Sequence, residues 1–134
     1  MNKYKNKPKG LYRSKLEETA AELLTKAGID FEYEPWQITL QKAYTTGLVC
    51  YEKVGKQFKQ SKSVRSIKYT PDFVGSNWII ETKGRKTEAF MIRWKLFKKI
   101  LEDQGKNYAL FLPSSKKEII ESLEIIKNLK DEKK

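Results

Sequence analysis

The sequence predicts a single α/β domain in which helices pack on a mixed β-sheet. Three observations predict it. The chain has 134 residues of one composition, 39% of them hydrophobic, which is enough for one core. Apolar residues recur at helical spacing in three segments, and short runs rich in β-branched and aromatic residues lie between them. The resulting order of helix, several strands, helix, strand and helix is typical of layered α/β proteins.

The first helix is predicted over residues 14–27. Ser14 is suited to cap its N-terminus, and Glu17 follows three residues later, as in a capping box. Gly28 is suited to end the helix in a left-handed conformation. The apolar face predicted for this helix consists of Leu16, Ala20, Leu23, Leu24 and Ala27.

The middle of the chain is predicted to be β-structure. Residues 29–33 alternate between apolar and polar, as a half-buried strand does. Residues 36–51 are rich in Thr, Tyr, Val and Ile, which predicts strands with a turn near Gly47. Residues 53–63 are polar and basic, and we expect them to form a loop or the tip of a hairpin.

Two more strands are predicted before the second helix. Residues 64–73 read as a strand that Pro71 breaks, because proline cannot donate a hydrogen bond to a ladder. Residues 78–82 form a short apolar strand, which we expect at the centre of the sheet.

The last part of the chain is predicted to be helix, strand, helix. A helix over residues 86–102 ends near Gly105, a buried strand follows at 108–112, and residues 113–115 start the last helix. The apolar stripe of the first of these helices comprises Phe90, Trp94, Phe97 and Leu101. The stripe of the last helix comprises Ile119, Leu123, Ile126 and Leu129.

The positive charge is the strongest bulk property. The chain has 28 Lys and Arg against 17 Asp and Glu, a net charge of +11. The basic residues gather in segments 1–15, 53–68 and 83–99, and residues 16–52 are acidic. Such an excess predicts a polyanionic partner, nucleic acid before an anionic membrane surface. The residues that we expect to contact DNA are Lys9, Arg13, Lys15, Lys59, Lys62, Arg65, Lys68, Arg85 and Lys86.

The same composition limits the domain organisation and the compartment. We expect residues 1–10 to be a flexible basic arm and residues 11–134 to be one domain. No apolar run approaches the about 20 residues that span a bilayer. No apolar stretch follows the Lys-rich residues 1–10, so we expect no secretory signal. With Cys50 as the single cysteine, a cytoplasmic protein is expected.

The absence of histidine narrows the chemistry further. Zinc sites with histidine ligands, Ser–His and Cys–His pairs and histidine bases are excluded. Catalysis must therefore use carboxylates, Lys, Tyr, Ser or a metal held by oxygen ligands.

Asp72 and Glu81 are the sharpest chemical signal. Asp72 follows the break at Pro71, and Glu81 follows the apolar strand. Side chains repeat every two residues in a strand, so Glu81 and Lys83 are expected to point the same way. A hairpin would place Asp72 beside Glu81, and two such carboxylates repel unless a cation lies between them. Oxygen ligands without His or Cys favour Mg²⁺ or Mn²⁺.

Glu17 is the expected third metal ligand, and Thr82 is included in the metal site. Lys83 is expected to orient or deprotonate the attacking water, or to stabilise charge on a phosphate. The alternatives are structural. Glu17 could only complete the capping box, residues 70–72 could be a plain turn, and Glu81 with Lys83 could be a surface pair.

Four segments, in this order, resemble phage endonuclease I, a family of Holliday-junction-resolving nucleases in the PD-(D/E)xK superfamily. They are residues 11–17, 27–36, 69–73 and 81–84. The resemblance implies a restriction-endonuclease-like αβββαβ core with a mixed central sheet and an extended β arm. It implies two Mg²⁺ (or Mn²⁺) ions per active site and Lys83 at the reaction centre. The implied metal ligands are Glu17, Asp72 and Glu81.

The resemblance also has implications for assembly and substrate. It implies a domain-swapped homodimer whose composite sites take Glu17 from one chain and Asp72, Glu81 and Lys83 from the other. The implied substrates are branched DNAs, cut by paired nicks, and a phage enzyme would act in the cytoplasm of its host. The segment 37–68 is longer than the family predicts, and residues after 84 match only loosely.

Three functions remain at this point. The first is a Mg²⁺-dependent endodeoxyribonuclease that resolves Holliday junctions by paired phosphodiester hydrolysis. The second is a nuclease of the same superfamily without junction selectivity, which would cut a junction and a matched linear duplex equally. The third is a non-catalytic DNA-binding protein on this scaffold, which would bind DNA and leave it intact with metal present.

Overall fold

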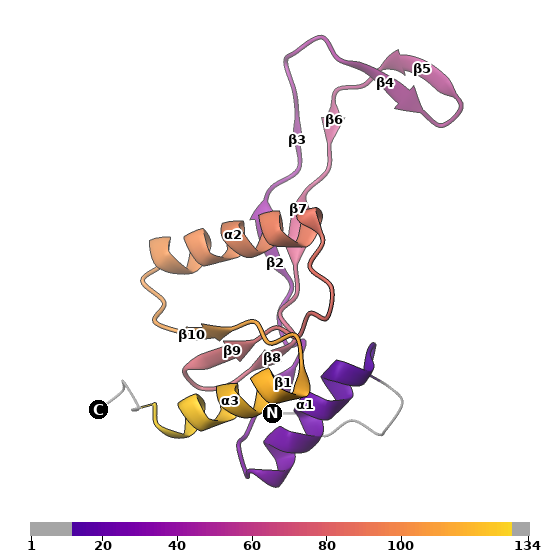
Figure 1. Ribbon diagram of the computed structural model, residues 1–134. Coiled ribbons are helices and arrows are strands. Elements are labelled where there is room, and N and C mark those ends of the chain that lie inside the picture. Colours follow the sequence, from indigo (N-terminus) through magenta and orange to yellow (C-terminus); the bar gives the residue numbers. More distant parts are fainter. Residues whose placement is uncertain (1–11, 130–134) are drawn as a thin grey trace.

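The computed structural model describes residues 12–129, so the basic arm predicted for residues 1–10, with Lys9, lies outside the described residues. Figure 1 shows the elements. They are α1 (Lys15–Lys26), β1 (Glu32–Tyr33), β2 (Ile38–Gln41), β3 (Tyr44–Thr45), β4 (Tyr51–Val54), β5 (Gln57–Gln60), β6 (Ser63–Val64), β7 (Ile67–Tyr69), β8 (Phe73–Val74), β9 (Trp78–Ile80), α2 (Glu88–Asp103), β10 (Ala109–Phe111) and α3 (Lys116–Lys127). Within the described part of the chain, no helix combines the length and apolar character needed to cross a membrane.

A four-stranded mixed sheet forms the centre of the body, in the order β1-β8-β9-β10. β1 and β9 both pair with β8 in antiparallel fashion, whereas β9 and β10 are parallel. The prediction of a mixed sheet with the strand at residues 78–82 in its interior is therefore confirmed. Apart from the arm strands, the chain order is helix, three strands, helix, strand and helix.

Helices cover both faces of this sheet (Figure 1). α1 and α3 lie on one face, in a core that includes Phe73, Trp78 and Ile80. α2 covers the other face, in a core that includes Val74 and Ile79. Neighbouring residues of a strand point to opposite faces, so β8 and β9 each contribute to both cores. The body is thus an α/β protein with a helical layer on either side of the sheet.

Local sequence determines where the helices begin. Ser14, Thr87 and Ser115 are the N-caps, and each side chain accepts a hydrogen bond from the backbone N–H three residues later. The start of the first helix and that of the last one are confirmed. The second helix starts after the predicted residue 86 because Thr87 caps it. Gly28, with φ 71°, follows the end of α1 in the expected left-handed conformation.

Three details of packing differ from the prediction. The buried residues of α1 are Glu17, Ala20, Ala21 and Leu24. Leu16 and Leu23, predicted for the same face, are half-buried. Of the strand predicted over residues 29–33, only the last two residues pair in the sheet. The strand predicted as buried at 108–112 is half-buried, because β10 lies at the edge of the sheet.

Residues 38–69 form a two-stranded arm, whose base, β2 with β7, packs against α2 and whose remainder projects from the body (Figure 1). Three antiparallel pairs build it: β2 with β7, β3 with β6, and β4 with β5. The chain reverses at Gly55, whose φ of 67° suits a two-residue hairpin turn. Near Gly47, where a turn was predicted, the chain bends between β3 and β4 without reversing, and the hairpin closes at Gly55 instead. The hairpin tip predicted within residues 53–63 is confirmed.

Gly75 is expected to tolerate no side chain. It lies between β8 and β9, and an added Cβ would lie 2.0 Å from Cε2 of Trp78, which is buried in the core. We expect Gly75→Ala to lower the free energy of unfolding by about 1–3 kcal/mol, as overpacking does, measured by urea denaturation. Gly47→Ala is the control, because nothing lies within 4 Å of its Cβ position. Equal stability losses in the two variants would contradict this prediction.

Candidate functional site

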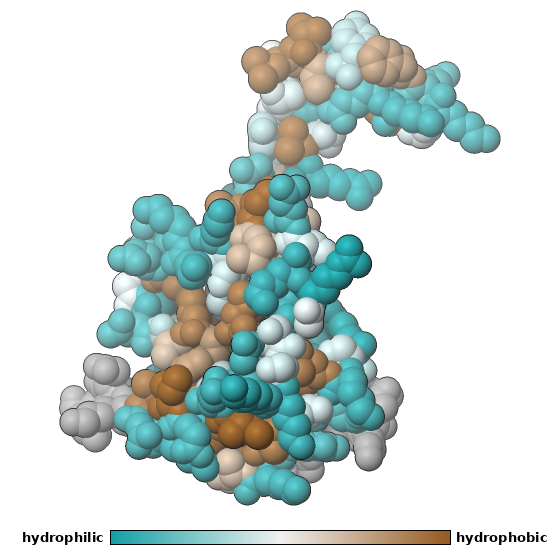
Figure 2. Space-filling view, viewed as in Figure 1, coloured by the Kyte–Doolittle hydropathy of each residue, from teal (hydrophilic) through white to brown (hydrophobic). Residues whose placement is uncertain are grey.

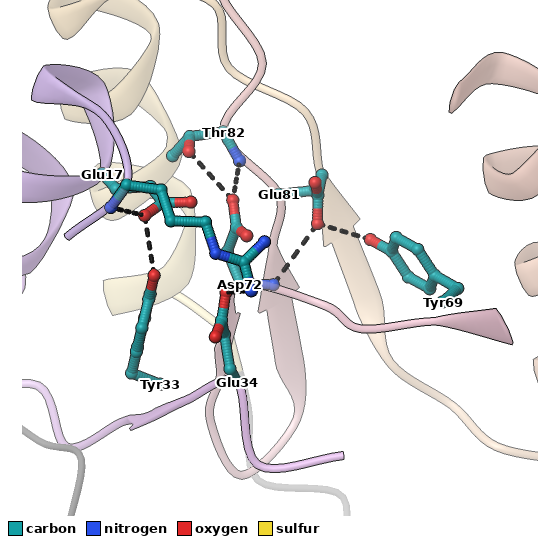
Figure 3. Close-up of polar contacts among 8 residues, drawn as sticks. Glu17, Tyr33, Glu34, Tyr69, Asp72, Glu81 and Thr82 are labelled. Carbon is teal, nitrogen blue, oxygen red and sulfur yellow. Dashed lines mark hydrogen bonds and ion pairs between the residues drawn. The ribbon is translucent and has the colours of Figure 1, made fainter. Parts of the chain in front are cut away.

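Carboxylates converge where the ends of β1, β8 and β9 meet the first turn of α1 (Figure 3). One carboxylate oxygen of each of Glu17, Glu34 and Asp72 lies within 4.8 Å of the other two. Glu81 adjoins this group, since its Oε1 accepts a hydrogen bond of 3.3 Å from the backbone N–H of Asp72. Elements far apart in the sequence thus bring four acids to one end of the sheet.

Backbone pairing beyond the strand ends holds these acids in place. The N–H of Glu34 donates to the carbonyl of Asp72 at 2.8 Å, which extends the pairing of β1 with β8. The N–H of Glu81 donates to the carbonyl of Phe111 at 2.9 Å, which extends the pairing of β9 with β10. Pro71, which is buried, separates β7 from β8 and places Asp72 at the start of the central hairpin.

Asp72 and Glu81 are both buried, with 4% of each residue exposed, and neighbouring side chains orient them. The backbone N–H and the hydroxyl of Thr82 each donate to Oδ2 of Asp72 at 2.9 Å. The hydroxyl of Tyr69 donates to Oε1 of Glu81 at 2.5 Å. The structure therefore brings the two predicted carboxylates together, and Thr82 contacts Asp72 directly.

Glu17 takes part in the N-terminal cap of α1 and also lies in the acid group. The hydroxyl of Ser14 accepts a hydrogen bond of 3.1 Å from the N–H of Glu17, as an N-cap does. Oε1 of Glu17 accepts from the backbone N–H of Arg13 at 2.9 Å and from the hydroxyl of Tyr33 at 2.7 Å. The residue thus stabilises the start of α1 and also points its carboxylate into the acid group.

The acid group assembles within one chain. The resemblance implies that Glu17 reaches the site from a second chain, whereas here Glu17 lies beside Asp72 of its own chain. No exchange of elements between subunits is needed to bring these carboxylates together.

Glu34 is the acid that the sequence did not single out. Its φ is 48°, a left-handed value that costs roughly 1–3 kcal/mol in a residue other than glycine. Its buried Oε2 lies 2.7 Å from Nη2 of Arg13, in an ion pair rather than a well-directed hydrogen bond. The sequence feature that could have identified Glu34 is its position directly before Pro35, at the end of a strand-like segment.

Burial controls the protonation of the site. It raises the pKa of Asp72, and the nearby charges of Glu81 and Glu17 raise it further. Burial also raises the pKa of Glu81, against the opposing effects of the Tyr69 hydrogen bond and the Lys83 charge. The pKa of Tyr69 is raised as well, mainly by burial, so its hydroxyl remains a donor. The folded protein therefore disfavours several negative charges at this place unless a cation compensates them.

Glu17, Asp72 and Glu81 line an open cleft of about 530 Å³ that also contains cations. Glu81 and Lys83 both line it, as expected for residues two apart in an extended segment. Nζ of Lys83 lies 4.7 Å from the centre of the Phe90 ring. The other cationic residues of the cleft are Arg13, Lys68 and Arg93.

The predicted DNA contacts fall into separate groups. Arg13 and Lys68 line the cleft. Three predicted contacts lie on the arm: Lys59 in β5, Lys62 just before β6, and Arg65 between β6 and β7. The remaining predicted DNA contacts among the described residues are Lys15, Arg85 and Lys86. They are exposed and lie near the start of α1 or of α2. Only the first group is brought to the acids.

Comparison with known proteins gives one match. A family model described as "Protein of unknown function (DUF1064)" matches residues 2–113, a range that includes all four acids, Lys83 and the arm. No curated protein and no solved structure matches the chain.

Proposed function

The chain belongs to the DUF1064 family of proteins of unknown function, and we propose that it is a metal-dependent endodeoxyribonuclease that resolves branched DNA. The observation that carries this proposal is the convergence of four carboxylates, three of which line a cleft together with Lys83 and further cations. The order of elements and the mixed sheet support a restriction-endonuclease-like core, which is part of the proposal.

The acid group fits a divalent cation. Its carboxylates are buried or half-buried, and burial together with mutual repulsion raises the pKa of Asp72. A bound cation would relieve this repulsion, and donor sets of oxygen alone favour Mg²⁺ or Mn²⁺. We propose that Glu17, Glu34, Asp72 and Glu81 would together hold two such ions. Such ions lower the pKa of bound water and neutralise charge on a phosphate.

The chain's own groups would position the DNA for hydrolysis. Lys83, held against Phe90, shares the cleft with the acids and would orient the attacking water or stabilise charge on the phosphate. Tyr69 and Thr82 keep Glu81 and Asp72 in place through their hydrogen bonds. The guanidinium and ammonium groups of the cleft would bind phosphates on either side of the cut.

Branched DNA is the proposed substrate, with Holliday junctions as the model case. The cleft and the basic arm, which projects from the body (Figure 1), are suited to contact two DNA segments at once. Paired cuts across a junction require two active sites, and we therefore propose a homodimer. Exchange of elements between the subunits, with the arm as the connecting part, remains a prediction.

Cleavage of a labelled four-way junction and of a linear duplex of matched sequence, with Mg²⁺ or Mn²⁺, tests the proposal. Symmetric cuts in the junction alone are expected. Equal cutting of both DNAs would support the proposed nuclease activity and contradict the proposed selectivity for junctions. Folded protein that binds both DNAs and cuts neither would overturn the proposed activity in favour of a DNA-binding protein.

Glu34→Gln is expected to weaken metal binding. The substitution keeps the shape of the side chain and removes one of the converging charges, so Mn²⁺ affinity should fall about tenfold or more, measured by isothermal titration calorimetry. Glu22→Gln, an exposed position on α1, is the matched control. If both variants bind Mn²⁺ as the wild type does, Glu34 is not a ligand.

A further inference from the structure

The tip of the arm exposes apolar side chains. Among the described residues, the three most exposed large hydrophobic ones lie there, with exposed fractions of 73% for Leu48, 78% for Val49 and 76% for Phe58. Tyr51 is 55% exposed. Figure 2 shows hydrophobic groups at the end of the arm, among hydrophilic side chains. Exposed apolar surface that gathers in one place marks an interaction site more often than scattered residues do.

The β4–β5 hairpin presents an aromatic face. In its register Lys53 lies opposite Phe58, and Tyr51 lies opposite Gln60, so these four side chains share one face. The rings of Tyr51 and Phe58 lie 6.1 Å apart between centroids, inclined by 32°. All eight strand residues of the hairpin are exposed. A lone two-stranded hairpin is marginally stable in water, so a partner would stabilise this one.

Charge identifies the kind of partner. Residues 51–65 contain one acid, Glu52, against five cations, a net charge of +4. The cations are Lys53, Lys56, Lys59, Lys62 and Arg65. A second copy of this chain would carry the same charges, within a total of +11. The complementary partner is a polyanion with flat apolar groups, which describes nucleic acid.

We propose that the arm tip binds DNA by stacking of unpaired or unstacked bases on Phe58 and Tyr51, while its lysines hold the adjoining phosphates. Bases inside a linear duplex have their faces covered by neighbours, whereas branch points and single strands expose them. The inference rests on the proposed function in taking DNA as the substrate. It adds a means by which the arm selects branched DNA.

Binding measured in EDTA tests this proposal without any cleavage. The probes are a fluorescent single strand, a linear duplex and a four-way junction, followed by anisotropy. We expect the double variant Tyr51→Ala/Phe58→Ala to lose about tenfold or more in affinity for the single strand and the junction, with a smaller loss for the duplex. Ile92→Ala, at an exposed position of α2, is the control. Circular dichroism checks that each variant is folded.

Two further variants separate stacking from charge. Phe58→Trp should show tryptophan quenching with the single strand beyond that of the wild type, because the indole would stack on a base. Lys53→Ala, on the face of Tyr51 and Phe58, should weaken binding to all three probes and reduce the salt dependence by about one phosphate contact.

Two results would overturn the stacking proposal. One is unchanged affinity of the double variant together with no added quenching in Phe58→Trp. The other is a wild-type dimer in sedimentation and a monomeric double variant with the same DNA affinity as the wild type. That result would make the arm tip a self-association surface. If the protein does not cleave DNA but its DNA binding depends on Phe58, the proposed nuclease activity is wrong and the proposed role of the arm still holds.

Discussion

Asp72→Asn is expected to abolish DNA cleavage, with a rate lower than wild type by about 10³-fold or more. Asp72 adjoins Glu17 and Glu34 on one side and Glu81 on the other, so its charge serves the whole acid group. Loss of several kcal/mol of charge stabilisation at the phosphate corresponds to such a factor. The asparagine retains an oxygen that can accept from Thr82, so the fold should persist. Single-turnover cleavage of a labelled junction with Mg²⁺ measures the effect.

The matched control is Asp103→Asn. Asp103 lies at the end of α2 in an exposed pair with Lys99, and such surface pairs contribute little to stability. Its variant should cut at the wild-type rate. An Asp72→Asn enzyme within about tenfold of wild type would show that the acid group does not carry the chemistry.

The second large effect concerns stability without metal, which should decrease as the pH rises from 5 to 8. The folded-state pKa values of Asp72 and Glu81 are raised, chiefly by burial, above the ordinary carboxyl value of about 4. The folded protein therefore binds these protons more tightly than the unfolded chain. The contribution of these raised pKa values to the free energy of unfolding is complete below about pH 4. It is lost as the pH rises through the folded-state pKa values. Each unit of difference corresponds to about 1.4 kcal/mol.

Thermal unfolding in EDTA at several pH values measures this dependence. Asp72→Asn should flatten the profile and unfold at a higher temperature than the wild type at pH 8. Added Mn²⁺ should restore the stability of the wild type at pH 8 and leave the variant unchanged, because a ligand stabilises only the state that binds it. Parallel pH profiles for the two proteins would mean that Asp72 ionises in the folded protein without cost.

The parts of the fold that follow from local chemistry were predictable. Ser14 and Ser115 cap helices because their hydroxyls accept backbone N–H groups within the same turn. Pro71 breaks a strand because it has no N–H to donate. The apolar segment before Glu81 is an interior strand because it contributes to both cores. These signals lie within a few residues of their effects.

The remaining features depend on contacts between distant residues. Glu34 joins the site because its backbone pairs with residue 72, a register that no local pattern encodes. Gly47 and Gly55 are equally suited to a turn by composition, and the cross-strand pairing of the arm decides for Gly55. The segments of β3, β4 and β5 read like sheet strands, but they are exposed because they project beyond the body (Figure 1).

Metal binding tests the central claim most directly. Mn²⁺ titrated into the protein at pH 8 and followed by electron paramagnetic resonance counts bound ions without any DNA. The account predicts that the wild-type chain binds Mn²⁺ through its acid group and that folded Asp72→Asn loses this binding. A folded wild-type protein that binds no Mn²⁺, or an Asp72→Asn protein that binds it equally well, would contradict the account.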